Sequence, residues 1–174
     1  MSEGSAPREG TYARAGAGLA LGVFLLDQLT KLAVILGFGY APYTRPDSFF
    51  PGPSVEVFPF FNLSLVWNRG VSFGLFQGEA EWQRWLLILF SLVVAGGLVL
   101  WLRRAADRVT ALAVGAVIGG AIGNLVDRLT YAAVVDFFEF HAFGYHWYVF
   151  NVADSAIVLG VAGLLYVSFI GEGR

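Results

Sequence analysis

The sequence contains no cysteine, so it offers no disulfide, no thiol nucleophile and no thiolate metal ligand. Its two histidines, His141 and His146, are too few for a zinc site with three histidine ligands, and no H-E-x-x-H pattern occurs. Charged residues are also scarce: they make up 14% of the 174 residues, whereas a soluble domain carries about 25%. Any catalytic groups must therefore be carboxylates, hydroxyls, lysine or one of the two histidines. We expect neither a metal nor a cofactor.

Long apolar runs take the place of the missing charges. Hydrophobic residues make up 57% of the chain, and four runs are long enough to cross a hydrocarbon core, which takes about 20 helical residues. These runs cover approximately residues 15–36, 85–102, 109–129 and 152–170. The first run is too long for the core of a cleaved signal peptide and contains Asp27 and Lys31, which predicts a retained helix. We therefore expect residues 1–174 to form a single membrane domain, an all-α membrane bundle of four transmembrane helices.

The basic residues predict how these helices are oriented. They precede the first run, fill the link between the second and third runs, and end the chain: Arg8, Arg14, Arg103, Arg104, Arg108 and Arg174. Because cytoplasmic loops carry the excess of Arg and Lys, we expect both termini in the cytoplasm and both long connections outside. The 11 basic residues form no patch interleaved with exposed aromatics, which excludes nucleic acid as a partner.

The two outer connections differ from ordinary linkers. Residues 38–83 combine Phe, Pro and Gly with apolar–polar alternation, which predicts short strands joined by turns. Residues 137–150 are heavily aromatic, which is typical of a segment that lies at the membrane interface.

Charged residues inside membrane helices cost about 2.5–3.5 kcal/mol each on insertion scales, so each needs a partner or a wet cavity. Asp27 and Lys31 lie one helical turn apart, acid before base, which favours an i,i+4 pair. This pair either only neutralises itself and orients the helix, or also braces a catalytic site or contacts substrate. At the end of the third run, Asn124 shares a helix face with Arg128, and Asp127 can pair locally with Arg128 to end the helix. Arg128 can also bind carbonyls or carboxylates through the N–H donors of its planar guanidinium group.

Asp136 and Asp154 are candidates for acid–base chemistry. Asp136 has apolar neighbours, which suggests that it is desolvated. Asp154 lies one turn after Asn151 at the start of the fourth helix, where an acid also favours the helix dipole. If the two carboxylates meet, repulsion lets them share one proton, so that one deprotonates a water while the other polarises a carbonyl. Such a pair hydrolyses a peptide without a metal, a thiol or a serine nucleophile.

The third run also carries a repeated small-xxx-small spacing at Gly115, Gly119 and Gly123. This spacing predicts close packing between helices. It does not indicate a phosphate loop, because no G-x-x-x-x-G-K-[ST] pattern occurs.

Five sequence blocks stand in order along almost the whole chain. They are Asp27-Gln28-Leu29-Thr30-Lys31, Asn68-Arg69-Gly70-Val71-Ser72-Phe73-Gly74, Gly123-Asn124-Leu125-Val126-Asp127-Arg128, Val134-Val135-Asp136-Phe137 and Phe150-Asn151-Val152-Ala153-Asp154-Ser155. Together, on four predicted helices, they resemble the bacterial lipoprotein signal peptidases, also called signal peptidase II. One departure is Ser72, where many members have Ala. The proline-rich stretch 42–60 looks long, and it either adds a function or extends the outer part of the fold.

This resemblance implies a catalytic dyad of Asp136 and Asp154. It also implies that further polar residues support the site or contact the substrate: Asn124, Arg128, Asn151, Asn68, Gly70, Asp27, Lys31 and Asp127. The implied reaction removes the signal peptide of a prolipoprotein by cleaving before its diacylglyceryl-modified cysteine. The implied fold adds a small extracytoplasmic β-cradle to the helices, within the lipids of the bacterial cytoplasmic (inner) membrane and with the active site toward the extracytoplasmic face. The resemblance further implies inhibition by globomycin, and we expect the enzyme to act as a monomer.

Other classes remain open from the residues alone. A small transporter would also place Asp, Lys and Arg within the membrane, but it would spread them through the bilayer depth. A non-catalytic scaffold would tolerate Asn in place of both candidate aspartates. A Ser–Lys enzyme would use Lys31 with Ser72 or Ser155, although an acid one turn away would keep that lysine charged. A Ser–His enzyme would need His141 or His146 beside a nucleophilic serine, but no G-x-S-x-G elbow occurs.

Overall fold

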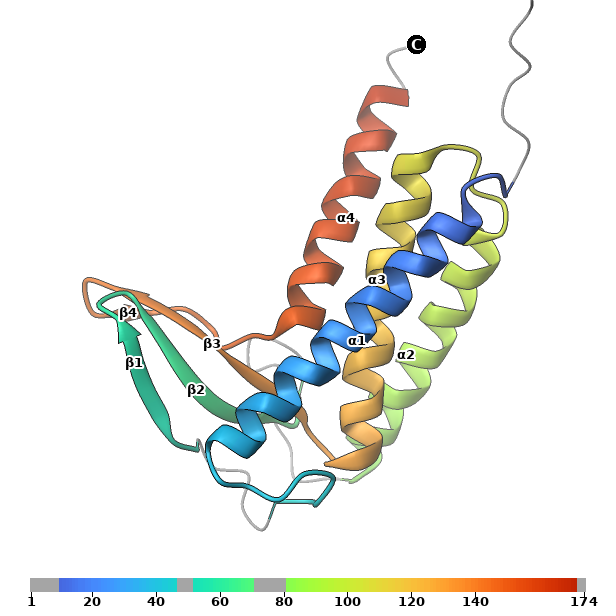
Figure 1. Cartoon of the computed structure of the whole chain (residues 1–174). Helices are drawn as coiled ribbons and strands as arrows, with labels where there is room; N and C mark the ends of the chain where they lie inside the picture. Colours follow the sequence, from blue (N-terminus) through green and yellow to red (C-terminus); the bar gives the residue numbers. More distant parts are fainter. Residues whose placement is uncertain (1–9, 47–51, 71–80, 172–174) are drawn as a thin grey trace, which may run out of the picture.

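The computed structural model describes residues 10–46, 52–70 and 81–171, which form long helices and a small sheet (Figure 1). The described helices are α1 (Ala13–Gly37), α2 (Glu81–Leu102), α3 (Arg108–Thr130) and α4 (Val152–Gly171). All four are long and apolar enough to cross a membrane. The largest difference from the expected bounds is at α2, which begins at Glu81 rather than near residue 85. Its first turn is too polar to belong to an apolar run, but an acid at that position favours the helix dipole.

Helix α3 lies at the centre of the bundle. In the window that would cross the membrane, 72% of α3 is buried inside the protein, against 28% of α1, 17% of α4 and 11% of α2. The other three helices pack against α3 (Figure 1). Their outward leucines, such as Leu89 and Leu159, are 58% and 72% exposed and face lipid in a membrane. Polar side chains that need partners are therefore best placed around α3.

Small residues let α1 and α4 approach α3 closely. A Cβ added at Gly115 would collide with the backbone of Gly16, and one added at Gly119 would collide with the backbone of Ala20. On another face of α3, a Cβ at Gly120 would collide with a carbonyl in the first turn of α4. The predicted close packing of the small-xxx-small spacing is therefore confirmed.

An antiparallel sheet in the order β1-β2-β3-β4 projects to one side of the bundle (Figure 1). Its strands are β1 (Ser54–Phe58), β2 (Phe61–Asn68), β3 (Val134–Ala142) and β4 (Tyr145–His146). The first two strands come from the connection between α1 and α2, and the last two come from the connection between α3 and α4. Strands β2 and β3 pair from Phe61 opposite Phe140 to Asn68 opposite Val134. This register carries Asn68 and Asp136 to the end of the sheet nearest the helices.

The β3–β4 hairpin was not predicted, because the sequence indicated only an aromatic interfacial segment at residues 137–150. The first four residues of β3 are all buried, so no apolar–polar alternation marks the strand. The described part of the proline-rich stretch 42–60 extends the sheet: the Gly52 N–H donates to the Leu65 carbonyl at 2.7 Å, and the Leu65 N–H donates to the Pro53 carbonyl at 2.9 Å. Residues 47–51 of that stretch lie outside the described residues.

A buried apolar cluster joins the sheet to the end of α1. Its members are Val34, Ile35, Leu65, Trp67, Tyr131, Ala133, Val135 and Phe137. Val135 and Phe137 flank Asp136 on β3 and are 0% and 1% exposed. Because side chains alternate across a strand, these two anchors turn Asp136 to the opposite face. Asp136 therefore points toward the junction of α3 and α4.

Candidate functional site

Two carboxylates and two amides form the centre of the site, where β3 passes the end of α3 and the start of α4. Asp136 is 1% exposed, and both its oxygens accept hydrogen bonds. Its Oδ1 accepts from Asn151 Nδ2 at 2.7 Å, and its Oδ2 accepts from Asn68 Nδ2 at 2.9 Å. On α4, Asp154 Oδ1 accepts from Asn124 Nδ2 at 2.9 Å. Because Asn151 Nδ2 also donates to Asn124 Oδ1 at 3.1 Å, the two amides link the two carboxylates.

Helix α4 begins with a reciprocal cap. Asn151 Oδ1 accepts the backbone N–H of Asp154 at 2.9 Å, and Asp154 Oδ2 accepts the backbone N–H of Asn151 at 3.3 Å. This pattern is similar to a capping box, in which two side chains satisfy each other's free backbone donors. One oxygen of Asp154 thus holds the helix start while the other faces Asn124. A role at the helix start and a role in the site are compatible.

Lys31 lies between two buried aspartates next to these amides. Its Nζ is 2.8 Å from Asp27 Oδ2 and 2.7 Å from Asp127 Oδ2, and it donates to Asn124 Oδ1 at 3.1 Å. The predicted i,i+4 pair of Asp27 with Lys31 is therefore present. The local pair expected between Asp127 and Arg128 does not form, since Asp127 turns toward α1. Consecutive residues of a helix point about 100° apart, so Asp127 and Arg128 face different neighbours.

The two aspartates of this ion cluster also bind backbone beside the central carboxylates. Asp27 Oδ1 accepts the N–H of Ala153 at 2.9 Å, and Asp127 Oδ2 accepts the N–H of Val135 at 3.1 Å. Ala153 immediately precedes Asp154, and Val135 immediately precedes Asp136. The ion cluster therefore fixes the main chain before each of the two central aspartates.

Arg128 reaches from α3 to the loop that follows β2. Its Nη2 donates to the Gly70 carbonyl at 3.3 Å, and its Nη1 donates to the Asn124 carbonyl at 3.3 Å. Asn68 Oδ1 in turn accepts the N–H of Gly70 at 3.0 Å. The Nε of Arg128 is buried and has no hydrogen-bond partner within the described residues. The guanidinium therefore has a donor left for a carbonyl or carboxylate.

The rest of that loop, residues 71–80, lies outside the described residues, and so does the sequence departure at Ser72. The structure otherwise brings the sequence-predicted site residues into one connected network. Asp27, Lys31 and Asp127 form its base, the central amides and carboxylates lie next to them, and Arg128 with the loop residues closes one side.

The site favours a neutral carboxyl at one position. Burial disfavours the charged form of Asp136, and the nearby carboxylate of Asp154 repels it, so the pKa of Asp136 is raised well above its ordinary value. Hydrogen bonds from Asn68 and Asn151 oppose this shift without cancelling it. A buried carboxyl that retains its proton beside a half-buried second carboxyl supplies both an acid and a base.

The serine-based alternatives find no support in the described residues. Ser155 Oγ donates to the Asn151 carbonyl at 3.0 Å, and Lys31 is held by its two aspartates. The two histidines lie on the sheet, with ring centroids 5.1 Å apart, and contact Glu139 and Asn62 rather than a serine. No group of three or more His, Asp or Glu side chains in the described part of the chain is arranged to hold a metal.

Sequence reasoning missed one polar member of the network. Gln28 Nε2 donates to Asp127 Oδ1 at 3.1 Å and to the Gly123 carbonyl at 3.3 Å. Its position between Asp27 and Lys31, inside the first sequence block, was the available signal. A polar side chain in a membrane helix needs a partner, and α3 provides it.

Comparisons with known proteins show which family the chain is similar to. Residues 19–170 match the model of the family described as signal peptidase (SPase) II. The lipoprotein signal peptidase of Methylobacterium sp. (strain 4-46) is 46% identical over 159 residues, which cover 91% of each chain. That of Methylobacterium radiotolerans is 47% identical over 161 residues, covering 92% of this chain and 89% of the relative. A bacterial membrane enzyme solved by the in meso method is 26% identical with a TM-score of 0.73, covering 92% of this chain and 90% of the other. A second such structure is 25% identical with a TM-score of 0.71, covering 93% and 96%.

Proposed function

Because the chain belongs to the signal peptidase II family and is therefore a membrane peptidase, we propose that it removes the signal peptides of prolipoproteins by aspartic catalysis. Asp136 and Asp154 are the proposed catalytic residues. The observation that carries this proposal is the linkage of the two carboxylates through the amides of Asn151 and Asn124. The whole chain would then work as one membrane domain with a single site.

In the proposed reaction, Asp154 is the base and Asp136 is the acid. A water donates one proton to Asp154 while its oxygen attacks the scissile carbonyl carbon, and Asp136 donates its proton to the carbonyl oxygen. When the tetrahedral intermediate collapses, the carbon–nitrogen bond breaks, Asp154 transfers its proton to the leaving amine, and Asp136 recovers a proton from the intermediate's hydroxyl. Both carboxyls thus return to their starting states. The buried, proton-retaining environment of Asp136 supports this division of roles.

The neighbouring polar groups would hold the substrate backbone. Arg128 has a buried donor without a partner in the described residues, and it lies beside the Gly70 carbonyl. We assign to Arg128 the binding of a substrate carbonyl. Asn68 positions Asp136 directly through its amide, while Asn124 and Asn151 orient both carboxylates. Asp27, Lys31 and Asp127 act as positioning residues, because they contact the backbone before each catalytic aspartate.

The proposal includes the substrate and the location of the reaction. The scissile bond is the one before a diacylglyceryl-modified cysteine, whose acyl chains remain in the lipid. The protein lies in the bacterial inner membrane as a monomer, with both termini in the cytoplasm and the site toward the outer face. The arginines of the α2–α3 link lie at the opposite end of α3 from the site, which supports this orientation. Globomycin, a cyclic peptide, would inhibit the enzyme by occupying the two aspartates.

The test is cleavage of a purified diacylglyceryl-modified prolipoprotein by the wild type and by Asp136→Asn and Asp154→Asn. Wild-type cleavage before the lipidated cysteine is expected. Each variant should lose about 10²–10⁴-fold in kcat, because the asparagine side chain that replaces the aspartate cannot act as a general acid or a general base. Asp107→Asn is the matched control. It makes the same chemical change at the N-cap of α3, where Asn caps about as well as Asp, and it should remain active.

Full activity in either site variant would remove that aspartate from the chemistry. A folded wild type that leaves the lipid-modified substrate intact would refute the proposed function.

A further inference from the structure

Strand β2 contains one residue more than β3 between two regularly paired stretches. Leu63 pairs with Phe138, and Val66 pairs with Asp136. Two residues therefore separate these pairs on β2, whereas one residue separates them on β3. Such an insertion is a β-bulge, and bulges are frequent next to active sites because they change the direction of a side chain. This bulge lies between the outer part of the sheet and the proposed catalytic residues.

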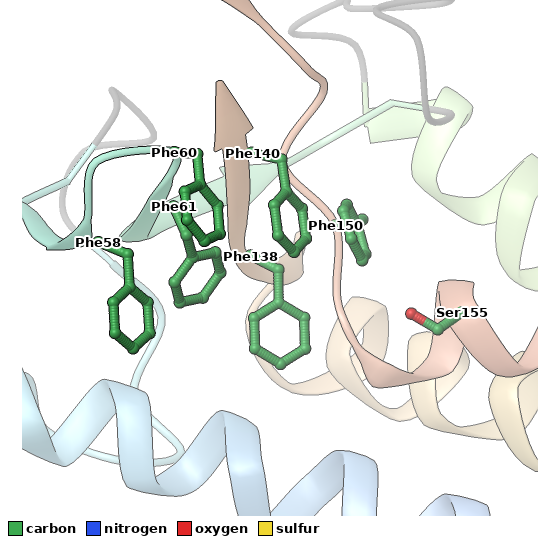
Figure 2. Close-up of a pocket in the computed structure, with 7 residues that line it drawn as sticks. All are labelled: Phe58, Phe60, Phe61, Phe138, Phe140, Phe150 and Ser155. Carbon is green, nitrogen blue, oxygen red and sulfur yellow. The ribbon is translucent and has the colours of Figure 1, made fainter. Parts of the chain in front are cut away.

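The bulge determines which face of β2 carries Asn68. Figure 2 shows the rings of Phe61, Phe138 and Phe140 on the same side of the sheet, where they line one pocket. Side chains alternate along β3, so Asp136 also points to this side. On β2, the odd-numbered residues point to this side before the bulge and the even-numbered residues after it. Asn68 is therefore on the side of Asp136, whereas an unbroken ladder would turn it to the other face.

The two residues of the bulge, Ser64 and Leu65, both point to the face opposite Asp136. Leu65 is 0% exposed and belongs to the same apolar cluster as Phe137. Ser64 is 5% exposed, and its Oγ donates a hydrogen bond to Glu139 Oε2. A regular strand would place consecutive side chains on opposite faces. These two contacts therefore hold the extra residue of β2 in place.

Glu139 connects the bulge to the neighbouring strands. Its Oε2 also accepts from Asn62 Nδ2 of β2 at 3.3 Å, and its Oε1 lies 2.7 Å from His146 Nδ1 of β4. On β1, Ser54 Oγ lies 2.6 Å from Ser64 Oγ. Because the single hydroxyl hydrogen of Ser64 is donated to Glu139, Ser54 is the donor in this pair. The carboxylate of Glu139 is thus the shared acceptor of a polar network around the bulge.

We propose that Glu139 is a positioning residue for Asp136, because it holds the bulge that places Asn68 on the side of the catalytic residues. The inference rests on the proposed function and adds a residue outside the network that surrounds the two aspartates. Glu139 lies on the opposite face of β3 from Asp136, so it does not contact the reacting groups. Its effect passes through the bulge to the hydrogen bond of 2.9 Å from Asn68 Nδ2 to Asp136 Oδ2.

The experiment measures cleavage of the diacylglyceryl-modified prolipoprotein by the full chain over a range of pH. Glu139→Ala removes the acceptor that holds the bulge, and Ser64→Ala removes only the hydroxyl that reaches this acceptor. Glu56→Ala is the matched control, since it makes the same change at an exposed residue of β1 in the same sheet. The Tm of each variant is measured in parallel, and if Glu139→Ala does not fold, Ser64→Ala provides the test.

Glu139→Ala and Ser64→Ala should each lower kcat about three- to tenfold with KM unchanged, the range expected when one hydrogen bond is weakened. Burial raises the pKa of Asp136, and the hydrogen bond from Asn68 opposes this rise. Weakening that bond lets the pKa rise further, and Asp136 must be protonated to act as the acid. The alkaline limb of the kcat–pH profile should therefore move up by about 0.5–1 pH unit. Glu56→Ala should match the wild type.

A double-mutant cycle tests whether the effect passes through Asn68. In an Asn68→Ala background, Glu139→Ala should change neither kcat nor the alkaline limb any further, because the hydrogen bond to Asp136 is already absent. A role of Glu139 in stability alone would lower the Tm in both backgrounds and leave the alkaline limb where it is.

Three outcomes would overturn the inference. The first is a wild-type kcat and pH profile in both Glu139→Ala and Ser64→Ala. The second is an equal fold-loss of kcat for Glu139→Ala with and without Asn68. The third is a rise in KM alone, which would assign Glu139 to substrate binding. All three differ from failure of the proposed function, in which the wild type does not cleave the lipid-modified precursor.

Discussion

At the scale of single residues, the environment of Asp136 links its proton to the stability of the fold. Its raised pKa means that the folded protein keeps this proton over a pH range in which the unfolded chain has lost it. The contribution of Asp136 to the free energy of unfolding is thus complete below its ordinary pKa of about 3.9 and is lost as the pH rises through the folded-state value. Above that value the protein bears the full cost of a buried charge.

We therefore predict that Asp136→Asn weakens the pH dependence of stability. As the pH rises above about 4, the wild-type Tm should fall relative to that of the variant, because only the wild type must ionise at this position. Glu139 acts in the opposite direction. Partial burial alone would raise the pKa of Glu139, but hydrogen bonds from Ser64, His146 and Asn62 hold this pKa below its usual range. Glu139 therefore stabilises the fold once it is ionised.

Since Glu139 is present in both proteins, the difference between their Tm–pH curves isolates position 136. Thermal unfolding in detergent, followed by circular dichroism at several pH values, measures it. Parallel curves would show that Asp136 does not hold its proton more tightly in the folded state.

The residue scale also shows what a sequence can and cannot predict about a site. The pairing of Asp27 with Lys31 is local, so its spacing along one helix was sufficient to predict it. The second partner of Lys31 is Asp127, which is distant in sequence, and only the packing of α1 against α3 brings the two together. The sequence indicated which residues carry the polar chemistry, and the resemblance assigned them roles. The bonds between them, such as Asn151 to Asp136, depend on the fold.

At the scale of secondary-structure elements, the Lys31 cluster connects α1 to α3, to α4 and to β3. Asp27, Lys31 and Asp127 are all at most 2% exposed. Lys31→Met should destabilise the protein by about 3–5 kcal/mol, because it leaves buried carboxylates without their cation. Adding Asp27→Asn and Asp127→Asn should restore most of this loss, since the neutral triad no longer buries an unpaired charge. Equilibrium unfolding of the single and triple variants measures both steps, and a triple variant as unstable as the single one would contradict this account.

The contacts between helices make a second prediction at this scale. Gly115→Ala should push α1 away from α3, because the new methyl group would overlap the backbone of Gly16, and a cost of about 1–3 kcal/mol is expected. Gly97→Ala is the matched change on α2, where nothing lies within 4 Å of the added carbon. It should be neutral or stabilising by up to about 1 kcal/mol, because alanine favours a helix. Equal Tm values for the two variants would show that the α1–α3 contact is not tight.

The strands illustrate why one class of element was harder to predict. Strand β2 shows alternation, with Leu65 and Trp67 buried on one face, and the sequence predicted strands in that region. Strand β3 begins with four buried residues, since one face packs on the apolar cluster while the other carries Asp136 into the site. A strand buried on both faces has no period of two, so composition alone could indicate only an aromatic segment.

At the scale of the whole molecule, the distribution of side chains follows from a bilayer as solvent. Three helices present leucine and valine outward, and α3 collects the polar side chains on its buried faces. The sequence predicted this architecture well because long apolar runs are a strong signal. It could not predict that the sheet would be assembled from both outer connections. Residues that pair between β2 and β3 are more than 60 positions apart in the sequence. That pairing is what brings Asn68 to Asp136.

The orientation of the whole protein in the membrane gives the last prediction. The chain contains no cysteine, so single cysteine substitutions report accessibility without background. Tyr145→Cys lies on β4 at an exposed position, and Arg104→Cys lies at an exposed position in the α2–α3 link. A maleimide that cannot cross membranes should label Tyr145→Cys in intact spheroplasts, and Arg104→Cys only after the membrane is permeabilised, because basic links stay in the cytoplasm. The unsubstituted protein is the control for labelling. The reverse pattern would place the site on the cytoplasmic face and contradict the proposed orientation.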